Sequence, residues 1–182
     1  LPQHEKLNLL TKAAIVYIDQ QIKKDYEEIK KANKKLPEGM IYTIPVQYLY
    51  MRSFFNDIPV PGDVFPAYNY FRNQAKQAWV KHNTYLKGMI ALSLFRTGDV
   101  QNAKKIMASL KETSINHPEL GMYWKDMSGG YYWHQAPVEA QSVMIEAFTE
   151  IAKDNAAVDD MKTWLLKNKQ TNHWNTTKST AD

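Results

Sequence analysis

The chain has 182 residues, 44% of them hydrophobic, which is enough for one sizeable core and too few to favour two independent ones. No apolar stretch approaches the 18 or so residues that a transmembrane helix requires, so direct membrane insertion is not expected. The absence of cysteine excludes disulfides, thiolate zinc sites and a cysteine nucleophile. The net charge of +4 comes from many lysines and three arginines, Arg52, Arg72 and Arg96, which argues against nucleic-acid binding.

The first third of the chain predicts two helices. Apolar residues recur every three or four positions, which indicates one long helix. Its predicted buried stripe consists of Leu7, Leu10, Ala14, Ile18, Ile22, Tyr26 and Ile29. Thr43 is expected to cap a second helix, with Pro45 in its first turn. The proline-containing segment 57–64 then breaks the chain, and we predict an internal boundary there.

The central part of the chain predicts a helical hairpin. Helices are expected over residues 66–82 and 85–96. Gly98 stands where a left-handed helix cap is favoured, and Asp99 can cap the helix that follows. Residues 121–133 are rich in glycine and aromatic residues without helical periodicity, so an irregular connection or a short hairpin is expected there.

Two more helices are expected over residues 137–154 and 157–168. The segment that begins at Trp133 aligns with the segment that begins at Trp174, an offset of 41 residues. Repeats of this length are typical of stacked helical pairs, in which each pair buries its apolar face against its neighbours. We therefore predict an all-α fold of paired antiparallel helices forming part of an α/α toroid. Residues 1–182 are expected to be one partial domain of a larger protein, because the chain opens without an initiator methionine.

The segment from Met161 to Ala181 resembles a segment of the α2-macroglobulin family, in which an outer helix leads through a tryptophan-containing turn into the next inner helix. The match is compact and lies in the last quarter of the chain. The matching residues are Trp164, Leu165, Leu166, Lys167, Gln170, Trp174, Thr177 and Ala181.

The resemblance implies a helical toroid domain within a large bacterial protein that traps proteinases, an endopeptidase inhibitor rather than an enzyme. It also implies a periplasmic, cell-envelope or extracellular location. The implied partners are neighbouring domains of the same polypeptide and a trapped proteinase. Family members with covalent chemistry form an internal thioester from a cysteine and a glutamine. This chain has no cysteine, so it cannot form that thioester itself.

Two tryptophans are expected to pack between the helical pairs of the repeat. Trp133 and Trp174 each precede a predicted helix, so each ring can be wedged between adjacent helical pairs while its N–H bonds a turn carbonyl. The sequence thus predicts that both rings are largely buried.

An aromatic cluster is the candidate interface or groove, and it consists of Tyr123, Trp124, Tyr131, Tyr132, Trp133 and His134. The alternative is a sugar-stacking platform of a polysaccharide lyase or glycosidase, which would need Asp126 and Glu139 as paired carboxylates. We favour packing or a protein interface, since two carboxylates near aromatic residues arise easily by chance. His134, Glu139 and His173 fit no zinc-binding spacing. We therefore expect no catalytic residues, no cofactor and no metal.

Overall fold

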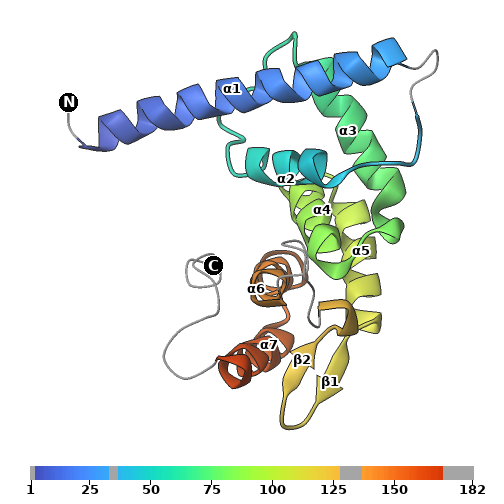
Figure 1. Ribbon diagram of the computed structural model, residues 1–182. Helices are drawn as coiled ribbons and strands as arrows, with labels where there is room; N and C mark the ends of the chain where they lie inside the picture. The colour runs from blue at the N-terminus through green and yellow to red at the C-terminus, as the bar shows by residue number, and fades with distance from the viewer. Residues whose placement is uncertain (1–2, 33–36, 128–136, 170–182) are drawn as a thin grey trace. The chain divides into compact units, whose positions relative to one another are not determined.

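The computed structural model describes residues 3–32, 37–127 and 137–169 (Figure 1). These residues form seven α-helices and one two-stranded sheet, which confirms the prediction of a mainly helical fold. The chain divides into two compact units, Leu1–Ala78 and Trp79–Asp182. The segment 57–64 lies inside the first unit and connects its second and third helices. No helix in the described part of the chain is long and apolar enough to span a bilayer.

The first unit contains three helices that contact one another: α1 (Gln3–Ala32), α2 (Thr43–Arg52) and α3 (Phe65–Ala78). Ile15 and Ile22 of α1 are buried, and they lie seven positions apart, on one face of the helix. Phe71 of α3 is also buried. Pro45 stands in the first turn of α2, as expected, where its missing N–H costs no helical hydrogen bond.

A buried polar cluster joins α1 to α2. The Asp19 side chain is 2% exposed and the Arg52 side chain 3%, and Arg52 Nε lies 3.2 Å from Asp19 Oδ1. The Tyr48 hydroxyl donates a hydrogen bond of 2.8 Å to the same oxygen. Burial raises the pKa of Tyr48, and the hydrogen bond to Asp19 raises it further. Removing either charged partner would leave the other buried and unpaired, which is strongly destabilising.

The second unit begins with a short helical turn, η1 (Trp79–Lys81), and continues with the predicted helical hairpin, α4 (Thr84–Arg96) and α5 (Val100–Glu112). The Asn83 side chain accepts a hydrogen bond from the Leu86 amide at the start of α4. Gly98 has a φ of +88°, and the Asp99 side chain caps α5 by accepting from the Asn102 amide. Both hairpin signals read from the sequence are therefore confirmed.

A short antiparallel hairpin follows α5. Strand β1 (Ile115–His117) pairs with β2 (Gly121–Tyr123), and a single helical turn, η2 (Lys125–Met127), comes next. The sheet thus uses only the first residues of the 121–133 segment, because their partner strand precedes that segment. Gly121 has a φ of +79°, and a side chain on it would overlap the backbone carbonyl oxygen of Asp160.

The last described helices are α6 (Pro137–Ala147) and α7 (Asn155–Asn168). The expected single helix over 137–154 is interrupted, because α6 widens into one π-helical turn, η4 (Phe148–Ala152), and ends at Lys153. The Lys153 backbone is left-handed, with a φ of 52°. Gly88 lets α4 approach α6 closely, because a methyl group on it would overlap Met144 Cε and lie 2.8 Å from Val143 Cγ1.

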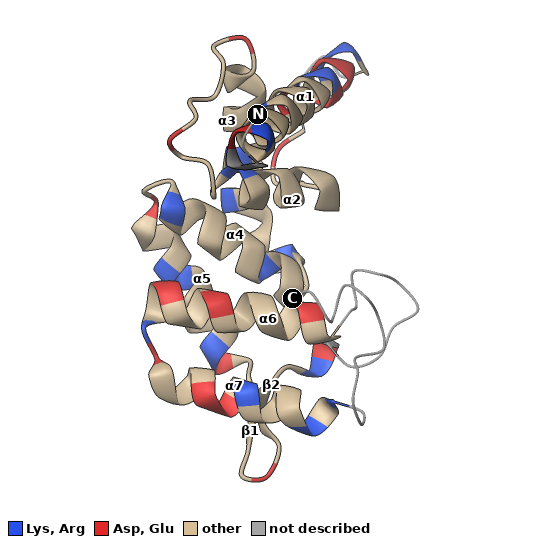
Figure 2. Cartoon of the chain, turned by 90° about the vertical axis from the view of Figure 1, so that its left-hand side faces the viewer, with Lys and Arg blue, Asp and Glu red and all other residues tan. Residues whose placement is uncertain are grey.

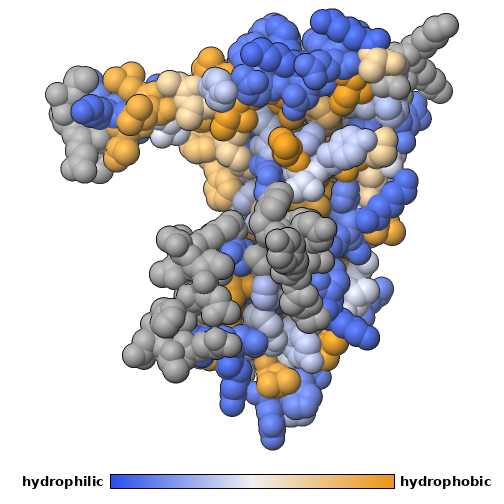
Figure 3. All heavy atoms as spheres, viewed as in Figure 1, coloured by the Kyte–Doolittle hydropathy of each residue, from blue (hydrophilic) through white to orange (hydrophobic). Residues whose placement is uncertain are grey.

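Two sequence-based expectations about the first unit are wrong. Thr43 does not cap α2, because it already lies inside the helix and the preceding Tyr42 makes no side-chain capping bond. The expected stripe of α1 is also displaced: Leu7, Leu10 and Ala14 are exposed. The N-terminal half of α1 carries apolar residues on more than one face, so periodicity alone could not select the buried one. Figure 3 shows hydrophobic residues gathered on that half of α1; the large exposed ones are Leu7, Leu9, Leu10, Val16 and Tyr17.

Candidate functional site

The aromatic cluster is described only in part. Trp124 is 2% exposed, its indole N–H donates a 2.8 Å hydrogen bond to the Leu110 carbonyl oxygen, and its ring lies 5.9 Å from that of Phe148. Tyr123 is half-buried, and its ring stacks on Trp164 of α7 with centroids 6.2 Å apart. Trp124 therefore belongs to the core of the second unit, and Tyr123 joins the hairpin to α7.

The remaining aromatic candidates lie outside the described residues. These are Tyr131, Tyr132, Trp133 and His134, together with Trp174 of the second repeat copy and His173. The equivalence of Trp133 and Trp174 stays a prediction. Among the described residues, no group of three or more histidine, aspartate and glutamate side chains is arranged to hold a metal ion.

The two carboxylates of the alternative sugar-cleaving site are both described. Asp126 accepts hydrogen bonds from the Thr84 amide and hydroxyl, at 2.8 Å and 2.7 Å, and so fixes the start of α4. Glu139 is only 3% exposed on α6. The hydrogen bonds at Asp126 occupy both of its oxygens, and this gives the carboxylate a clear structural role.

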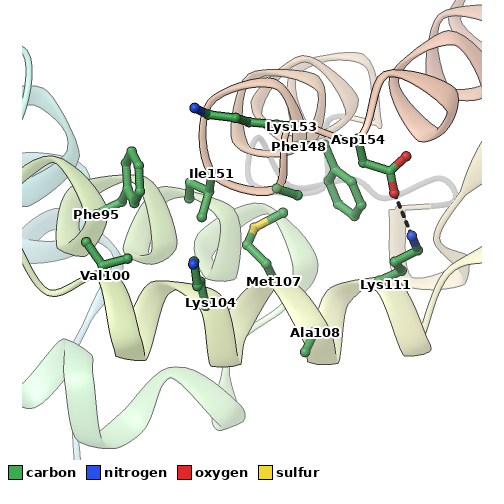
Figure 4. A pocket seen from close by; sticks show the side chains of 11 residues that line it. Phe95, Val100, Lys104, Met107, Ala108, Lys111, Phe148, Ile151, Lys153 and Asp154 are labelled. Carbon is green, nitrogen blue, oxygen red and sulfur yellow. Dashed lines mark hydrogen bonds and ion pairs between the residues drawn. The ribbon is translucent and has the colours of Figure 1, made fainter.

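A groove that sequence reasoning missed lies between α5 and the π-helical end of α6 (Figure 4). It has a volume of about 620 Å³. Its floor is apolar, because Met107, Phe148 and Ile151 line it and are all buried. Phe95 and Val100 close one end, and a lysine and an aspartate meet at the other. An apolar floor with a polar border is the usual composition of a binding groove.

Lysines border the groove on both sides. Lys104 and Lys111 come from α5, and Lys153 comes from the turn after η4. Lys111 forms a hydrogen-bonded ion pair with Asp154. The pKa of Asp154 is lowered mainly by this hydrogen bond and, to a smaller extent, by a hydrogen bond from the Ala157 amide. Lys104 and Lys153 form no ion pair with any residue that the structure describes, so the groove keeps an excess of positive charge.

The π-helical turn determines where Lys153 lies. An extra residue in the last turn of α6 shifts the positions after it, and the left-handed Lys153 backbone then turns the chain towards α7. The Asp154 amide donates to the Phe148 carbonyl oxygen at 3.3 Å, which closes this helix end. Left-handed backbone is uncommon for a residue other than glycine, and π-helical turns are frequent at functional sites.

A second ionic cluster fixes the neighbouring part of α6 to α4. Arg96 donates to Glu146 and Glu150, with shortest distances of 2.5 Å to each, and its side chain is 12% exposed. Burial alone would lower the pKa of Arg96, but the two hydrogen-bonded glutamates outweigh it and raise the pKa. Figure 2 marks the acidic residues of α6 and η4 in red. This cluster attaches the η4 side of the groove to α4. Its arginine stays charged throughout the accessible pH range.

One signal in the sequence could have located the groove. Val100, Lys104, Met107 and Lys111 recur at helical spacing beside the core face of α5, so an apolar stripe with lysines along it is readable from the chain. The opposite wall was not readable, because it depends on the π-helical turn inside a segment that otherwise predicts one continuous helix. Comparisons with protein-family models, with curated proteins and with solved structures gave no match to this chain.

Proposed function

We propose that this chain is a non-catalytic structural and binding module of a larger α2-macroglobulin-like envelope protein that traps proteinases. The observation that carries this proposal is the pairing of helices in the second unit. Helix α4 is buried on nearly all sides and lies against α6, whereas α5 and α7 each bury a single face. Alternation of wholly buried and amphipathic helices is what stacked helical pairs require.

The family named in this proposal rests on the resemblance at the end of the chain. Trp164, Leu165, Leu166 and Lys167 lie in the second half of α7, and Tyr123 stacks on Trp164. The other matching positions lie outside the described residues. An amphipathic helix ending in this motif agrees with the outer helix that the resemblance implies. An α/α toroid remains the architecture that we propose for the complete domain.

The proposed mechanism is conformational. A proteinase cleaves a bait segment elsewhere in the polypeptide, and the large protein then rearranges around the enzyme. The domain to which this chain belongs moves as a body, in the periplasm, in the cell envelope or outside the cell. The chain contributes no thioester, since it lacks the sulfur leaving group that this chemistry needs.

A structural role of Asp126 supports the non-catalytic part of the proposal. An acid or base that cleaves a glycosidic bond must be available to the substrate. Asp126 instead accepts two hydrogen bonds from Thr84, and Trp124 beside it lies in the core. Packing and binding are therefore the roles that we assign to this region.

The proposal is tested by comparing proteolysis of a large and a small substrate. The full-length product of the gene that encodes the chain is incubated with trypsin, and hydrolysis of casein is compared with hydrolysis of a small chromogenic peptide. A trap encloses the proteinase without blocking its active site, so casein hydrolysis should fall while peptide hydrolysis persists. Equal loss of both would indicate an active-site inhibitor, and loss of neither would contradict trapping; either result overturns the proposal.

A further inference from the structure

The N-terminal half of α1 carries an apolar surface that the described residues leave uncovered (Figure 3). Five large apolar side chains there are each more than half exposed: Leu7, Leu9, Leu10, Val16 and Tyr17. Ala13 and Ala14, which lie between them, are exposed as well. Lys12 is the one charged residue between Lys6 and Asp19, so charges hardly interrupt this surface. A contiguous exposed apolar patch of this kind marks an interaction site.

The spacing of these residues fits a helical partner. Apolar residues that recur three and four positions apart form the seam between two paired helices. Four exposed residues of α1 follow this spacing, and we call them the α1 stripe: Leu7, Leu10, Ala14 and Tyr17. Lys12 lies about 160° around the helix from Leu10, so it points away from the stripe. The stripe covers about three helical turns, which gives a partner helix several anchor positions.

The other side of α1 is occupied by the first unit itself. Ile15 and Ile22 are buried on that side, and Asp19 forms its ion pair with Arg52 there. A helix that binds a lipid surface keeps a polar, lysine-rich face in water. The corresponding face of α1 is packed against α2 and α3 instead. The stripe therefore suits another helix better than a lipid surface.

The α1 stripe is complementary to a second copy of itself. In an antiparallel pair with a twofold axis, Leu10 of each copy lies opposite Ala14 of the other copy. In the same register, Leu7 lies opposite Tyr17. Large side chains then meet small ones at the centre, which allows the two helices to interdigitate. No like charges meet in the seam, because Lys12 points away from it. A twofold interface uses the same patch on both copies, as this arrangement does.

The area of the surface is sufficient for a weak dimer. Each of the five large side chains leaves roughly 100 Å² uncovered, so one copy offers about 500 Å². Burial on both copies removes about 1,000 Å² from water, which is where specific interfaces begin. We propose that the chain forms a twofold-symmetric dimer, in which the α1 stripes of two copies pack antiparallel. This proposal is independent of proteinase trapping, because it rests on α1 alone.

The molar mass of the 182-residue chain in solution gives the first test. An interface near the lower size limit is expected to dissociate in the micromolar range. Sedimentation equilibrium at about 100 μM should therefore show mainly a dimer, with twice the chain mass of 21.1 kDa. A monomer at this concentration, or an assembly larger than a dimer, overturns the proposal.

Two exposed leucines give a matched pair of variants. Leu10→Glu places a carboxylate in the seam and should raise the dissociation constant of the dimer at least about tenfold. Leu166→Glu makes the same change on α7, at a side chain that is 73% exposed, and should change the dissociation constant less than twofold. Both positions are exposed and glutamate is a good helix former, so circular dichroism should show parental helix content. A dimer that resists Leu10→Glu, or that both variants weaken equally, overturns the proposal.

A second substitution tests the antiparallel register. Ala14→Lys, added to Leu10→Glu, places an ammonium group opposite each new carboxylate of the other copy. The double variant should dimerise about fivefold or more tightly than Leu10→Glu alone. Ala14→Glu in the same background adds a like charge and should weaken the dimer further. Equal dissociation constants for the two double variants would contradict the register and overturn the proposal.

Flotation with vesicles of phosphatidylcholine and phosphatidylglycerol distinguishes a lipid surface from a second copy. The parent chain should stay in the soluble fraction as a dimer. Flotation of the parent chain that Leu10→Glu abolishes would assign the stripe to a lipid surface and overturn the proposal.

Discussion

Gly121 lets strand β2 approach α7 at backbone distance, and Gly121→Ala tests this packing. The glycine has a φ of +79°, and a methyl group on it would overlap the Asp160 carbonyl oxygen and lie 3.1 Å from the Trp164 amide nitrogen. Both neighbours are backbone atoms, so no side-chain rotation can make room. The strand and helix must move apart, which also disturbs the stacking of Tyr123 on Trp164.

The expected loss of stability in Gly121→Ala has two parts. A left-handed backbone costs an alanine about 1–2 kcal/mol, and overpacking a well-packed contact costs about 1–3 kcal/mol more. We expect Gly121→Ala to lower the free energy of unfolding by about 2–5 kcal/mol. Gly98→Ala is the matched control, because Gly98 has a φ of +88° with no atom within 4 Å, so only the backbone cost of about 1–2 kcal/mol applies.

Urea unfolding followed by circular dichroism measures both variants against the parent chain. The Gly121→Ala midpoint should fall clearly below that of Gly98→Ala, with tryptophan fluorescence reporting the displaced α7. Equal losses for the two variants would refute the reasoning, because they would show that the hairpin and α7 separate without cost.

Three further predictions concern the ionic clusters. Asp19→Asn should lower the free energy of unfolding by about 3–5 kcal/mol, since it leaves the buried Arg52 charge unpaired. The same change at the exposed Asp57 should have almost no effect. Equal urea midpoints for the two variants would contradict this prediction. Arg96→Met should lower the free energy of unfolding by about 1–3 kcal/mol, because Glu146 and Glu150 lose the hydrogen-bond donor that they share. A thermal melt indistinguishable from the parent's would contradict this stabilising role of Arg96. Asp154→Asn should lower stability at neutral pH, and the deficit should disappear in strong acid. The folded pKa of Asp154 is depressed, so its contribution is present above the unfolded pKa of about 3.9 and is lost as the pH falls through the lower folded value. A deficit that is the same at neutral and strongly acidic pH would refute the assignment.

Local signals explain what could be predicted from the sequence. Gly98 and Asp99 mark the α4–α5 turn because a left-handed cap and a side-chain cap each involve only a few neighbouring residues. The helical periodicity of α5 and α7 is equally local. The sequence therefore predicts most helices and their connections within a few residues.

Long-range contacts explain what could not be predicted. In the sequence Trp124 belongs to the candidate interface or groove, and only its hydrogen bond to the Leu110 carbonyl oxygen and its contact with Phe148 place it in the core. The burial of Asp19 depends likewise on Arg52, far along the chain. The π-helical turn of η4 has no sequence signal that distinguishes it from continuous helix, so one wall of the groove was not foreseen.

Capture of an active proteinase by the full-length protein is the most direct test of the trapping proposal. The purified protein is incubated with trypsin or with trypsin whose catalytic serine is replaced, and the mixtures are separated by gel filtration. Active trypsin should co-elute with the large protein and still cleave a small peptide, while the inactive form should elute separately because it cannot cut the bait. Separate elution of both forms, or co-elution of both, would contradict a cleavage-triggered trap.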